Sequence, residues 1–443
     1  MTVPHHAGPL FTDLYELTMA AGYFARRMTS AATFSLFIRG YPPHRNFYVA
    51  AGLEDVLQEL QHLHFSTRDI DYLKDTGLFS EQFLAYLAAF RFSGTVHALS
   101  EGSIFFAEEP ILEITAPLIE AQIIETYLIN TVGLQTLIAS KAARCIHAAG
   151  GRPLIDFSLR RTQGHDAGLK VARSTYIAGF SATSNVLAGQ KYGIPISGTM
   201  AHSFVQAFGN DAEAFAAFAD VFPHNAVFLI DTYDVIDGAH EVVRVAREMQ
   251  KKGLSPVGVR LDSGDMVRLS QQVRGILDEA GLSEIKIFAS SGFDEYKIAT
   301  VLSAGARIDA FGVGTKVGVS ADAPYLDIVY KLVRYKRRDV RKFSPQKVTL
   351  AGEKQVFRVA GDGGIYLKDF IGVRNESVDG GLPMLAPVMK GGRVLGPHPS
   401  LSQIRDSFNA NFSTLPESIK ALDAGQTYPV HITARLKELQ KDI

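Results

Sequence analysis

A histidine and three aspartates stand at the ends of apolar segments, where they could take part in phosphate chemistry. His202 lies in SGTMAHSFVQAF, between small residues and an apolar tail. Asp231 follows the apolar run AVFLI, and Asp262 and Asp265 flank a Ser-Gly turn in VRLDSGD. Because magnesium is held by a few carboxylates together with substrate phosphate oxygens, these aspartates are candidates for a magnesium–diphosphate site. Each residue has a structural alternative, since a lone histidine beside Phe and Val often packs in a core, and Asp265 could cap the following helix.

Basic side chains follow an apolar segment in SLRRTQGHDAGLKVARS. The guanidinium group of arginine presents a fork of donors that suits phosphate, although a salt bridge at a strand end is the alternative for any single arginine. Arg260 beside Asp262 offers a cation and a carboxylate at one strand end. The basic candidates in the first segment are Arg160, Arg161, Lys170 and Arg173. Together these residues favour an anion site.

Two Gly-containing turns, ASSGFDEY and FGVGTKVG, come late in the chain. Small residues allow backbone N–H groups to approach a phosphate, and a helix N-terminus adds a favourable dipole. The candidates are Ser290, Ser291, Gly292, Gly314 and Thr315. The chain contains neither a GxSxG elbow nor a Walker A run. The residues are therefore typical of a polyphosphate-handling enzyme and not of one for acyl or hydride transfer.

The elements that must position these residues alternate between strand and helix from about residue 119 to 317. Apolar strands are expected at 153–159, 194–199, 226–234, 256–265, 284–292 and 308–317. Such alternation predicts a parallel sheet of the α/β class. A doubly wound sheet shares this pattern, but polar residues recur at five or six strand ends here, which favours a barrel with its site at the carboxyl edge.

The first third of the chain mixes element types. Helices are expected over 12–27 and 52–63, a strand over 33–40, and an antiparallel sheet within 93–118. This mixture predicts an α+β domain.

Composition narrows the class of protein. The chain has 443 residues, 47% of them apolar, and a formal net charge of −1, so no global charge draws it to nucleic acid or an anionic membrane. The basic stretch RYKRRDVRKFS is short and reads as a solvated surface. A single cysteine, Cys145, excludes an internal disulfide or a cysteine-based zinc site. Without a signal-peptide pattern or an apolar run of about 20 residues, we expect a soluble, cytoplasmic protein.

Motifs along nearly the whole chain resemble the nicotinate phosphoribosyltransferases of pyridine-nucleotide salvage. They are, in order, TDLYELTMA, FSLFIRGYP, EGSIFFAEEPILEI, DFSLRRTQGHDAG, GFSATSNVLAG, SGTMAHSF, LIDTYD, VRLDSGD, SSGFDEY and FGVGTKV. The resemblance implies an irregular TIM-like α/β barrel with an additional α/β sandwich domain built from both chain ends. The corresponding boundaries are 1–125 plus 335–443 for the sandwich and 126–334 for the barrel that carries the active site.

The family's reaction converts nicotinate and 5-phosphoribosyl 1-diphosphate to nicotinate mononucleotide and diphosphate, coupled to hydrolysis of ATP to ADP and phosphate. The resemblance implies that His202 is the histidine phosphorylated by ATP, that Mg²⁺ is the cofactor, and that a homodimer shares the active site. No nucleic-acid or membrane partner is expected.

Further roles follow from matching the family's motifs residue by residue. Phe157 and Tyr15 match the aromatic groups at the pyridine ring, with Tyr15 coming from the partner subunit, and Arg160 lies near the ribosyl-diphosphate. Thr199 and Arg260 match the nicotinate ring and carboxylate positions. Asp231 and Asp262 match the acidic groups around the ribose and diphosphate. The candidate metal ligands are Asp262 and Asp265. The phosphate-binding turns contain Ser291, Gly292, Gly314 and Thr315.

Ser184 helps to distinguish nicotinate, an acid, from nicotinamide, an amide, as the substrate. The related nicotinamide phosphoribosyltransferases carry an aspartate in the motif that here reads GFSATSN, and loss of that negative charge favours nicotinate. Three alternatives remain open: a nicotinamide-specific enzyme, a quinolinate phosphoribosyltransferase, for which the expected extra cluster of basic residues is not evident, and a non-catalytic nucleotide-binding scaffold.

Overall fold

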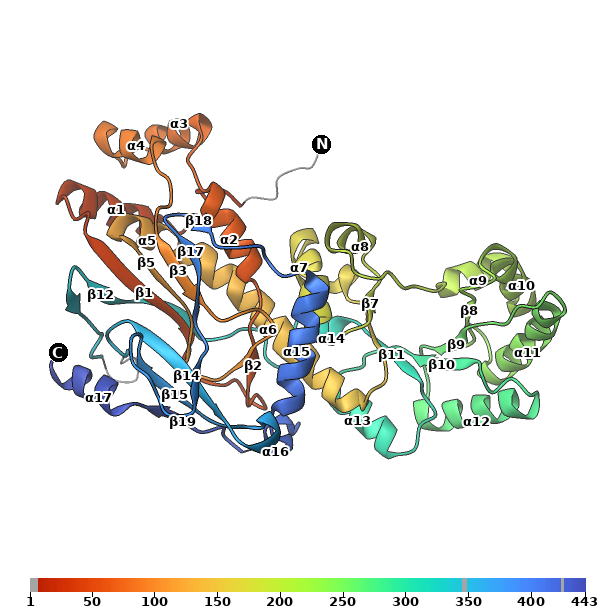
Figure 1. Cartoon of the computed structure of the whole chain (residues 1–443). Helices are drawn as coiled ribbons and strands as arrows, with labels where there is room; N and C mark the ends of the chain where they lie inside the picture. The colour runs from red at the N-terminus through yellow and green to blue at the C-terminus, as the bar shows by residue number, and fades with distance from the viewer. Residues whose placement is uncertain (1–6, 345–348, 424–425) are drawn as a thin grey trace. The chain divides into compact units, whose positions relative to one another are not determined.

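A computed structural model describes residues 7–344, 349–423 and 426–443 of the chain. The described residues form two compact units (Figure 1): one contains residues 1–139 and 325–443, and the other contains residues 140–324. The first unit thus brings together both ends of the chain and extends further at each boundary than the limits 125 and 335 expected from the sequence.

The unit built from both chain ends is organised around a seven-stranded antiparallel sheet of order β13-β12-β1-β5-β3-β17-β18. Strand β1 lies between β5 and β12, which come from opposite halves of the chain, with Phe34 opposite both Ile114 and Leu332. Almost every residue of β1 is buried, so this strand passes through the core. The strands are β1 (Ala31–Ile38), β3 (Thr95–Ala98), β5 (Pro110–Pro117), β12 (Ile328–Tyr335), β13 (Arg338–Asp339), β17 (Ala386–Lys390) and β18 (Arg393–Val394).

Two smaller sheets and several helices complete this unit. The four-stranded sheet has the order β16-β14-β15-β19, and β2 pairs with β4. These strands are β2 (Tyr48–Val49), β4 (Ile104–Phe105), β14 (Lys354–Ala360), β15 (Tyr366–Val373), β16 (Gly381–Pro383) and β19 (Val430–Ile432). The helices are α1 (Leu14–Ala25), α2 (Leu53–His62), α3 (Thr67–Asp75), α4 (Glu81–Ala88), α5 (Leu118–Ile123), α15 (Leu401–Thr414), α16 (Glu417–Lys420) and α17 (Ala434–Lys441). The helices expected over 12–27 and 52–63 and the antiparallel sheet within 93–118 are confirmed.

The second unit contains an open, six-stranded parallel sheet of order β7-β6-β11-β10-β9-β8. Consecutive strands are neighbours throughout the run from β8 to β11, and the last strand pairs with the first. This is the cyclic order of a barrel that is open between β7 and β8; a doubly wound sheet would reverse its order partway. The strands are β6 (Leu154–Asp156), β7 (Ala182–Thr183), β8 (Val227–Leu229), β9 (Gly258–Leu261), β10 (Lys286–Ala289) and β11 (Ala310–Val313).

Helices connect the strands of this sheet, and α11 and α12 pack beside β9 and β10 (Figure 1). Strands alternating with helices confirm the predicted parallel α/β arrangement. The helices are α7 (His165–Ile177), α8 (Val186–Tyr192), α9 (His202–Phe208), α10 (Asp211–Val221), α11 (Val235–Lys251), α12 (Met266–Glu279), α13 (Glu295–Ser303) and α14 (Thr315–Gly318). The long helix α6 (Glu125–Ala149) crosses the boundary between the units.

The strand expected over 194–199 is wrong. Only Ile196 of this segment forms a bridge, with Thr183, although the backbone N–H of Ser197 also donates to the Thr183 carbonyl. The segment pairs with β7 through this one bridge only, at the edge of the sheet, and does not continue as a strand.

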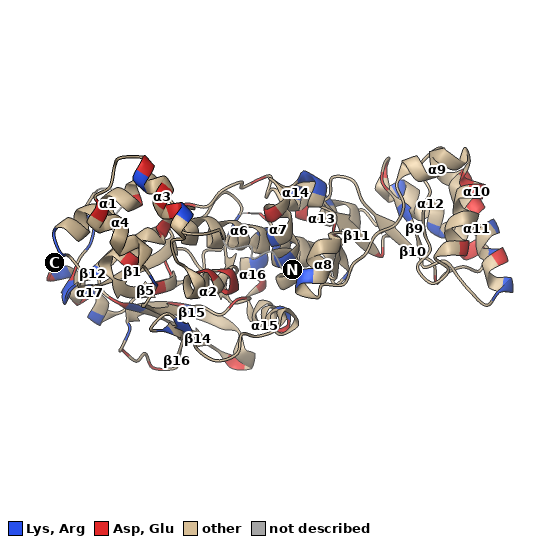
Figure 2. Ribbon diagram, turned by 90° about the horizontal axis from the view of Figure 1, so that it is seen from above, with Lys and Arg blue, Asp and Glu red and all other residues tan. Residues whose placement is uncertain are grey.

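The exterior of the parallel-sheet unit carries charged side chains. Charged residues of both signs lie on α11 (Figure 2), where Glu241 pairs with Arg244 and Glu248 with Lys251. None of the helices in the described ranges combines the length and apolar character that crossing a membrane requires.

Candidate functional site

Two adjoining cavities, of about 230 and 380 Å³, lie in the parallel-sheet unit. Parallel strands end at a common edge, so residues far apart in the sequence meet there. Both cavities are lined by Phe157, Gly198, Thr199, Arg260 and Ser290. The larger one is also lined by Arg160, Ser184 and Asp262, and the smaller one by Asn225. Many of the residues selected from the sequence therefore surround one connected space.

The end of β6 holds the aromatic wall of this space. The buried Asp156 accepts hydrogen bonds from the Ser158 N–H (2.9 Å) and hydroxyl (2.5 Å) and from the Thr183 hydroxyl (2.8 Å). Burial raises the pKa of Asp156, against hydrogen bonds that lower it. These bonds hold the turn that carries Phe157. Its ring lies so close to Gly312 that a Cβ there would come within 2.5 Å of it; glycine makes room for the ring.

Arg260, on β9, supplies a half-buried cation in the same wall. Its Nη1 donates to the Thr199 hydroxyl, while its Nε is buried with no hydrogen-bond partner in the part of the chain that the structure describes. Burial lowers the pKa of Arg260, against the neighbouring Asp262 and Asp231, which raise it. A buried N–H donor without a partner is costly, and an anionic ligand that the guanidinium reaches in the adjoining cavity would offset that cost.

Two aspartates meet across the ends of β8 and β9. Asp231 Oδ2 accepts from the Asp262 N–H at 3.0 Å and the Ser263 hydroxyl at 2.6 Å. Its other oxygen, Oδ1, is buried and has no hydrogen-bond partner among the described residues. Asp262 Oδ1 in turn accepts from the Ser290 hydroxyl at 2.5 Å. The two carboxylates thus bridge β8, β9 and β10.

His202 begins α9 at the open side of the sheet. Its Nδ1 lies 3.1 Å from the Thr232 hydroxyl, and its Nε2 lies 3.7 Å from Asp262 Oδ2. The side chain is 40% exposed, so the core-packed alternative does not describe it. An exposed imidazole beside a carboxylate can accept a group from a bound ligand.

The remaining candidates divide into two groups. Asp265 caps α12, accepting from the N–H groups of Val267 and Arg268, so its capping role is realised. In the phosphate-turn candidates, Ser291 and Gly292 both have left-handed backbones, with φ of 89° and 65°. Lys297 Nζ donates to the Ser291 carbonyl at 2.7 Å and closes this turn. Gly314 and Thr315 begin the short helix α14.

Other predicted residues lie apart from the cavity walls. Arg161 is exposed and Arg173 is buried. Tyr15 belongs to the other unit, on α1, where its side chain is half exposed and burial raises its pKa. Among the described residues, Asp231, Asp262 and Asp265 do not form a set whose ligand atoms all lie within 4.8 Å of one another.

Among the residues of the site that sequence reasoning missed are Asp156, Thr232 and Gly312. Asp156 and Thr232 each stand beside a selected residue, in LIDF and IDTYD. Their polarity at a strand end was a usable signal. The role of Gly312 depends on where the Phe157 ring lies, which no local pattern contains.

The fold and the site define an α/β protein with a cavity at the carboxyl edge of a parallel sheet, lined by basic, acidic and aromatic side chains. Models of the nicotinate phosphoribosyltransferase N-terminal domain, of the nicotinate phosphoribosyltransferase (NAPRTase) family and of its C-terminal domain match residues 10–133, 153–350 and 381–440. The chain is 46% identical to nicotinate phosphoribosyltransferase pncB2 of Mycobacterium tuberculosis, over 98% of this chain and 94% of the relative. It is 38% identical to nicotinate phosphoribosyltransferase of Bacillus subtilis, over 96% and 92% of the two chains.

A solved structure agrees with these matches. The crystal structure of human nicotinic acid phosphoribosyltransferase superposes with a TM-score of 0.86 at 30% identity, covering 98% of this chain and 99% of the human chain. The chain belongs to the nicotinate phosphoribosyltransferase family.

Proposed function

We propose that this protein joins nicotinate to 5-phosphoribosyl 1-diphosphate, giving nicotinate mononucleotide and diphosphate in NAD salvage, with ATP hydrolysis coupled to the reaction. The observation that carries the proposal is the pairing of Phe157 and Arg260 in the walls of the same two cavities. Nicotinate consists of an aromatic ring and a carboxylate, and these two side chains complement those two parts. The names of the relatives support the same substrate.

Arg260 orients the pyridine ring. Its guanidinium, held by Thr199, receives the nicotinate carboxylate, while the face of Phe157 packs on the ring. This fixes the ring nitrogen relative to the ribose carbon C1 and removes much of the orientational entropy cost from the reaction. The nitrogen is already an unprotonated nucleophile at neutral pH, so no general base is needed.

Other donors of the site hold the second substrate. Arg160 lies in the wall of the larger cavity, and we assign the diphosphate to it. The turns at Ser291–Gly292 and Gly314–Thr315 bind phosphate oxygens through backbone N–H groups. The new bond forms between the pyridine nitrogen and C1 as the C1–oxygen bond breaks, and the electron pair of that bond leaves with diphosphate. Arginine stabilises the charge that develops there.

The acidic groups fit a magnesium–diphosphate. Asp231 offers a buried oxygen without a partner among the described residues, and Asp262 is partly exposed at the cavity wall. Oxygen donors of this kind are those that magnesium prefers. Asp262 and Asp231 would hold the ion, which when bound neutralises charge on the diphosphate. Asp265, which caps α12 and does not converge with the other two carboxylates, is not assigned to the ion.

His202 is the group that we assign to ATP coupling. An unprotonated ring nitrogen takes the terminal phosphoryl group of ATP, ADP leaves, and water later releases phosphate and restores the imidazole. The contact with Thr232 and the nearby Asp262 orient the ring for this transfer. The added negative charge would act on the acidic site beside it.

Ser184 supports the acid over the amide as substrate. Its side chain carries no charge and lies in the wall of the larger cavity, so it does not repel a carboxylate there. We further infer that the open parallel sheet is the family's irregular barrel and the unit from both chain ends its sandwich domain. A cytoplasmic homodimer in which the partner contributes Tyr15 belongs to the same proposal.

The first experiment measures nicotinate mononucleotide formation with and without ATP for wild type, His202→Ala and a control, His240→Ala, on the exposed surface of α11. Wild type and the control should form product and respond to ATP, and His202→Ala should lose only the response. A wild type that prefers nicotinamide would refute the role of Ser184. Equal stimulation of His202→Ala would refute phosphorylation of His202, and substrate binding without turnover would indicate a scaffold.

A further inference from the structure

Three potential metal ligands meet in the unit built from both chain ends, outside the strand-end site. Glu54 lies in the first turn of α2, Glu101 in the turn before β4, and His398 in the segment before α15. One ligand atom of each lies within 4.8 Å of the other two. Residues separated by up to 344 positions in the sequence thus converge on one point.

Glu101 is held rigidly at this point. Its side chain is 2% exposed, and one oxygen, Oε1, accepts the Gly52 N–H at 2.6 Å. The following Gly102 has a left-handed backbone (φ 80°), and a Cβ there would lie 2.7 Å from the Ile404 carbonyl oxygen. The turn is therefore pressed against α15, and the second oxygen of Glu101, Oε2, is the one nearest His398.

The other contact of His398 selects the tautomer that binds metals. Its Nδ1 lies 3.1 Å from the Pro399 carbonyl oxygen, which can only accept, so Nδ1 carries the proton. In the neutral ring the lone pair is then on Nε2, which lies 3.9 Å from Glu101 Oε2. Metal-bound histidines commonly donate their other N–H to a carbonyl in this way.

The spacing suits ligands of a common ion better than a direct ion pair. Charge-assisted N–H···O bonds are about 2.7–2.9 Å long, shorter than the distance between His398 and Glu101. Two ligands each about 2.0–2.2 Å from one ion lie roughly 3–4 Å apart. A cavity of about 240 Å³, lined by Glu101, His398 and apolar residues such as Leu53 and Ile404, provides room for water to complete the coordination.

We propose that Glu54, Glu101 and His398 bind one divalent cation of the zinc class. One imidazole nitrogen and two carboxylates suit a borderline transition metal, whereas magnesium and calcium prefer oxygen ligands alone. The ion joins α2, the turn at 100–103 and the segment before α15. Because it binds the folded chain and not the unfolded one, it stabilises this unit.

Metal-free, full-length protein is titrated with ZnCl₂ by calorimetry, and its melting temperature is measured with and without zinc. Wild type should bind one zinc ion and melt at a higher temperature with it. His398→Ala and Glu54→Gln should bind zinc roughly 10-fold or more weakly and lose the thermal shift. His240→Ala, which removes an exposed histidine of α11, is the control and should behave as wild type. Circular dichroism establishes that each variant is folded before titration.

Four results overturn the proposal: no zinc binding by wild type, undiminished binding by folded His398→Ala, equal weakening by His240→Ala, or tighter binding of MgCl₂ than of ZnCl₂. The nicotinate reaction is assayed in the same preparations, and its loss or retention does not bear on zinc binding.

Discussion

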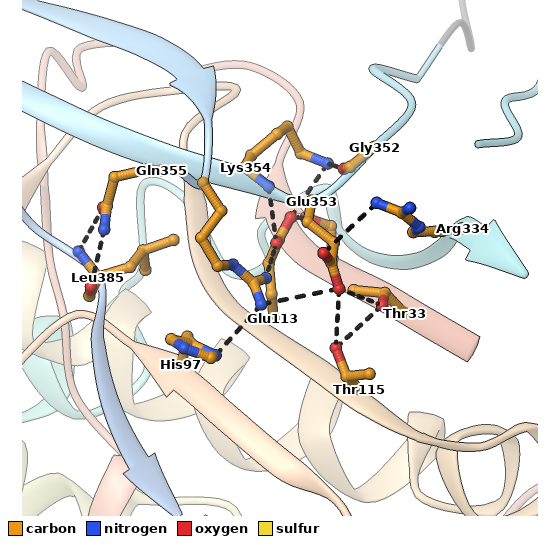
Figure 3. Close-up of polar contacts among 12 residues, drawn as sticks. Thr33, His97, Glu113, Thr115, Arg334, Gly352, Glu353, Lys354, Gln355 and Leu385 are labelled. Atoms are coloured by element: carbon orange, nitrogen blue, oxygen red, sulfur yellow. Dashed lines mark hydrogen bonds and ion pairs between the residues drawn. The ribbon is translucent and has the colours of Figure 1, made fainter. Parts of the chain in front are cut away.

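Two carboxylates, one in each unit, lie at the centre of polar clusters but differ in how their oxygens are partnered. Glu113, on β5, accepts from the Ser35 hydroxyl (2.5 Å) and lies 3.0 Å from Lys354 Nζ through Oε1. Its Oε2 accepts from the Lys354 N–H at 2.9 Å (Figure 3), and it also accepts from Arg374. In Asp231, Oδ2 accepts two hydrogen bonds. The other oxygen, Oδ1, is also buried but has no partner among the described residues.

The difference separates a structural cluster from a candidate binding site. Burial would raise the pKa of Glu113, but Lys354 and Arg374 outweigh it and hold the pKa below its usual value. Glu113 therefore stays charged inside the sheet because the fold itself supplies its partners. Asp231 and Arg260 each keep one buried polar atom without a hydrogen-bond partner among the described residues, at a cost to the stability of the fold. Unused polar capacity beside a cavity indicates where a ligand supplies the missing partner.

The largest expected effect, on the free energy of unfolding, tests the cluster around Glu113, in which every carboxylate oxygen has a partner. Glu113→Gln removes the charge that balances Lys354, a fully buried group whose pKa burial already lowers. Breaking such a buried pair costs about 3–5 kcal/mol in the free energy of unfolding. Urea unfolding measures it, with Glu248→Gln on exposed α11 as the control that should not change.

The double variant Glu113→Gln/Lys354→Met should regain part of the lost stability, since it no longer leaves a buried charge unpaired. If Glu113→Gln unfolds at the wild-type urea concentration, the cluster is not structural and the comparison with Asp231 fails.

The second effect, on catalysis, tests the cluster around Asp231 and Arg260, in which buried polar atoms lack partners among the described residues. Arg260→Ala should lower kcat/KM for nicotinate by about 10²–10³-fold, equivalent to about 3–4 kcal/mol, because it would remove the charge-assisted contact that we propose to the substrate carboxylate. The free energy of unfolding should change by less than about 1.5 kcal/mol, because the arginine contributes an unpartnered Nε. Arg244→Ala, an exposed arginine on α11, is the matched control.

Steady-state kinetics and urea unfolding on the same samples decide this prediction. A variant that unfolds easily but retains its kcat/KM when folded would show that Arg260 has a structural role like that of Lys354.

The smallest effect concerns Glu16, a buried carboxylate whose Oε1 also lacks a partner among the described residues. Burial raises the pKa of Glu16 to about 7, against a hydrogen bond from Gln122 that lowers it. The folded state therefore holds the proton more tightly than the unfolded chain, and stability falls as pH rises from about 4.5 to about 7. Glu16→Gln should remove this slope and stabilise the protein at pH 8 by roughly 1 kcal/mol.

Thermal melts at pH 5 and pH 8 test this prediction. Equal pH dependence in wild type and Glu16→Gln would contradict it, and would mean that an unpartnered oxygen in this unit is not neutralised by a proton.

The local sequence pattern was sufficient to predict most strands and helices and many of the residues that line the candidate site. The apolar runs before Asp231, Arg260 and Ser290 were recognisable as strands, and parallel strands necessarily bring their ends to one edge. The segment 194–199 was misread, because short apolar runs look alike whether or not a partner strand is present on both sides. Partners such as Thr232 for His202 depend on how two loops meet and could not be selected individually.

The sequence by itself determined the parallel strand–helix unit, the family and the residue types available for chemistry, because periodicity, turn residues and motif order are local properties of the chain. Only the tertiary structure decided that β12 pairs with β1, that the sheet opens between β7 and β8, and that Glu54, Glu101 and His398 converge. It also decided which buried charges are satisfied. Hydrogen bonds and ion pairs act over a few ångströms in space, and the distance between two residues in space is set by the packing of the whole chain.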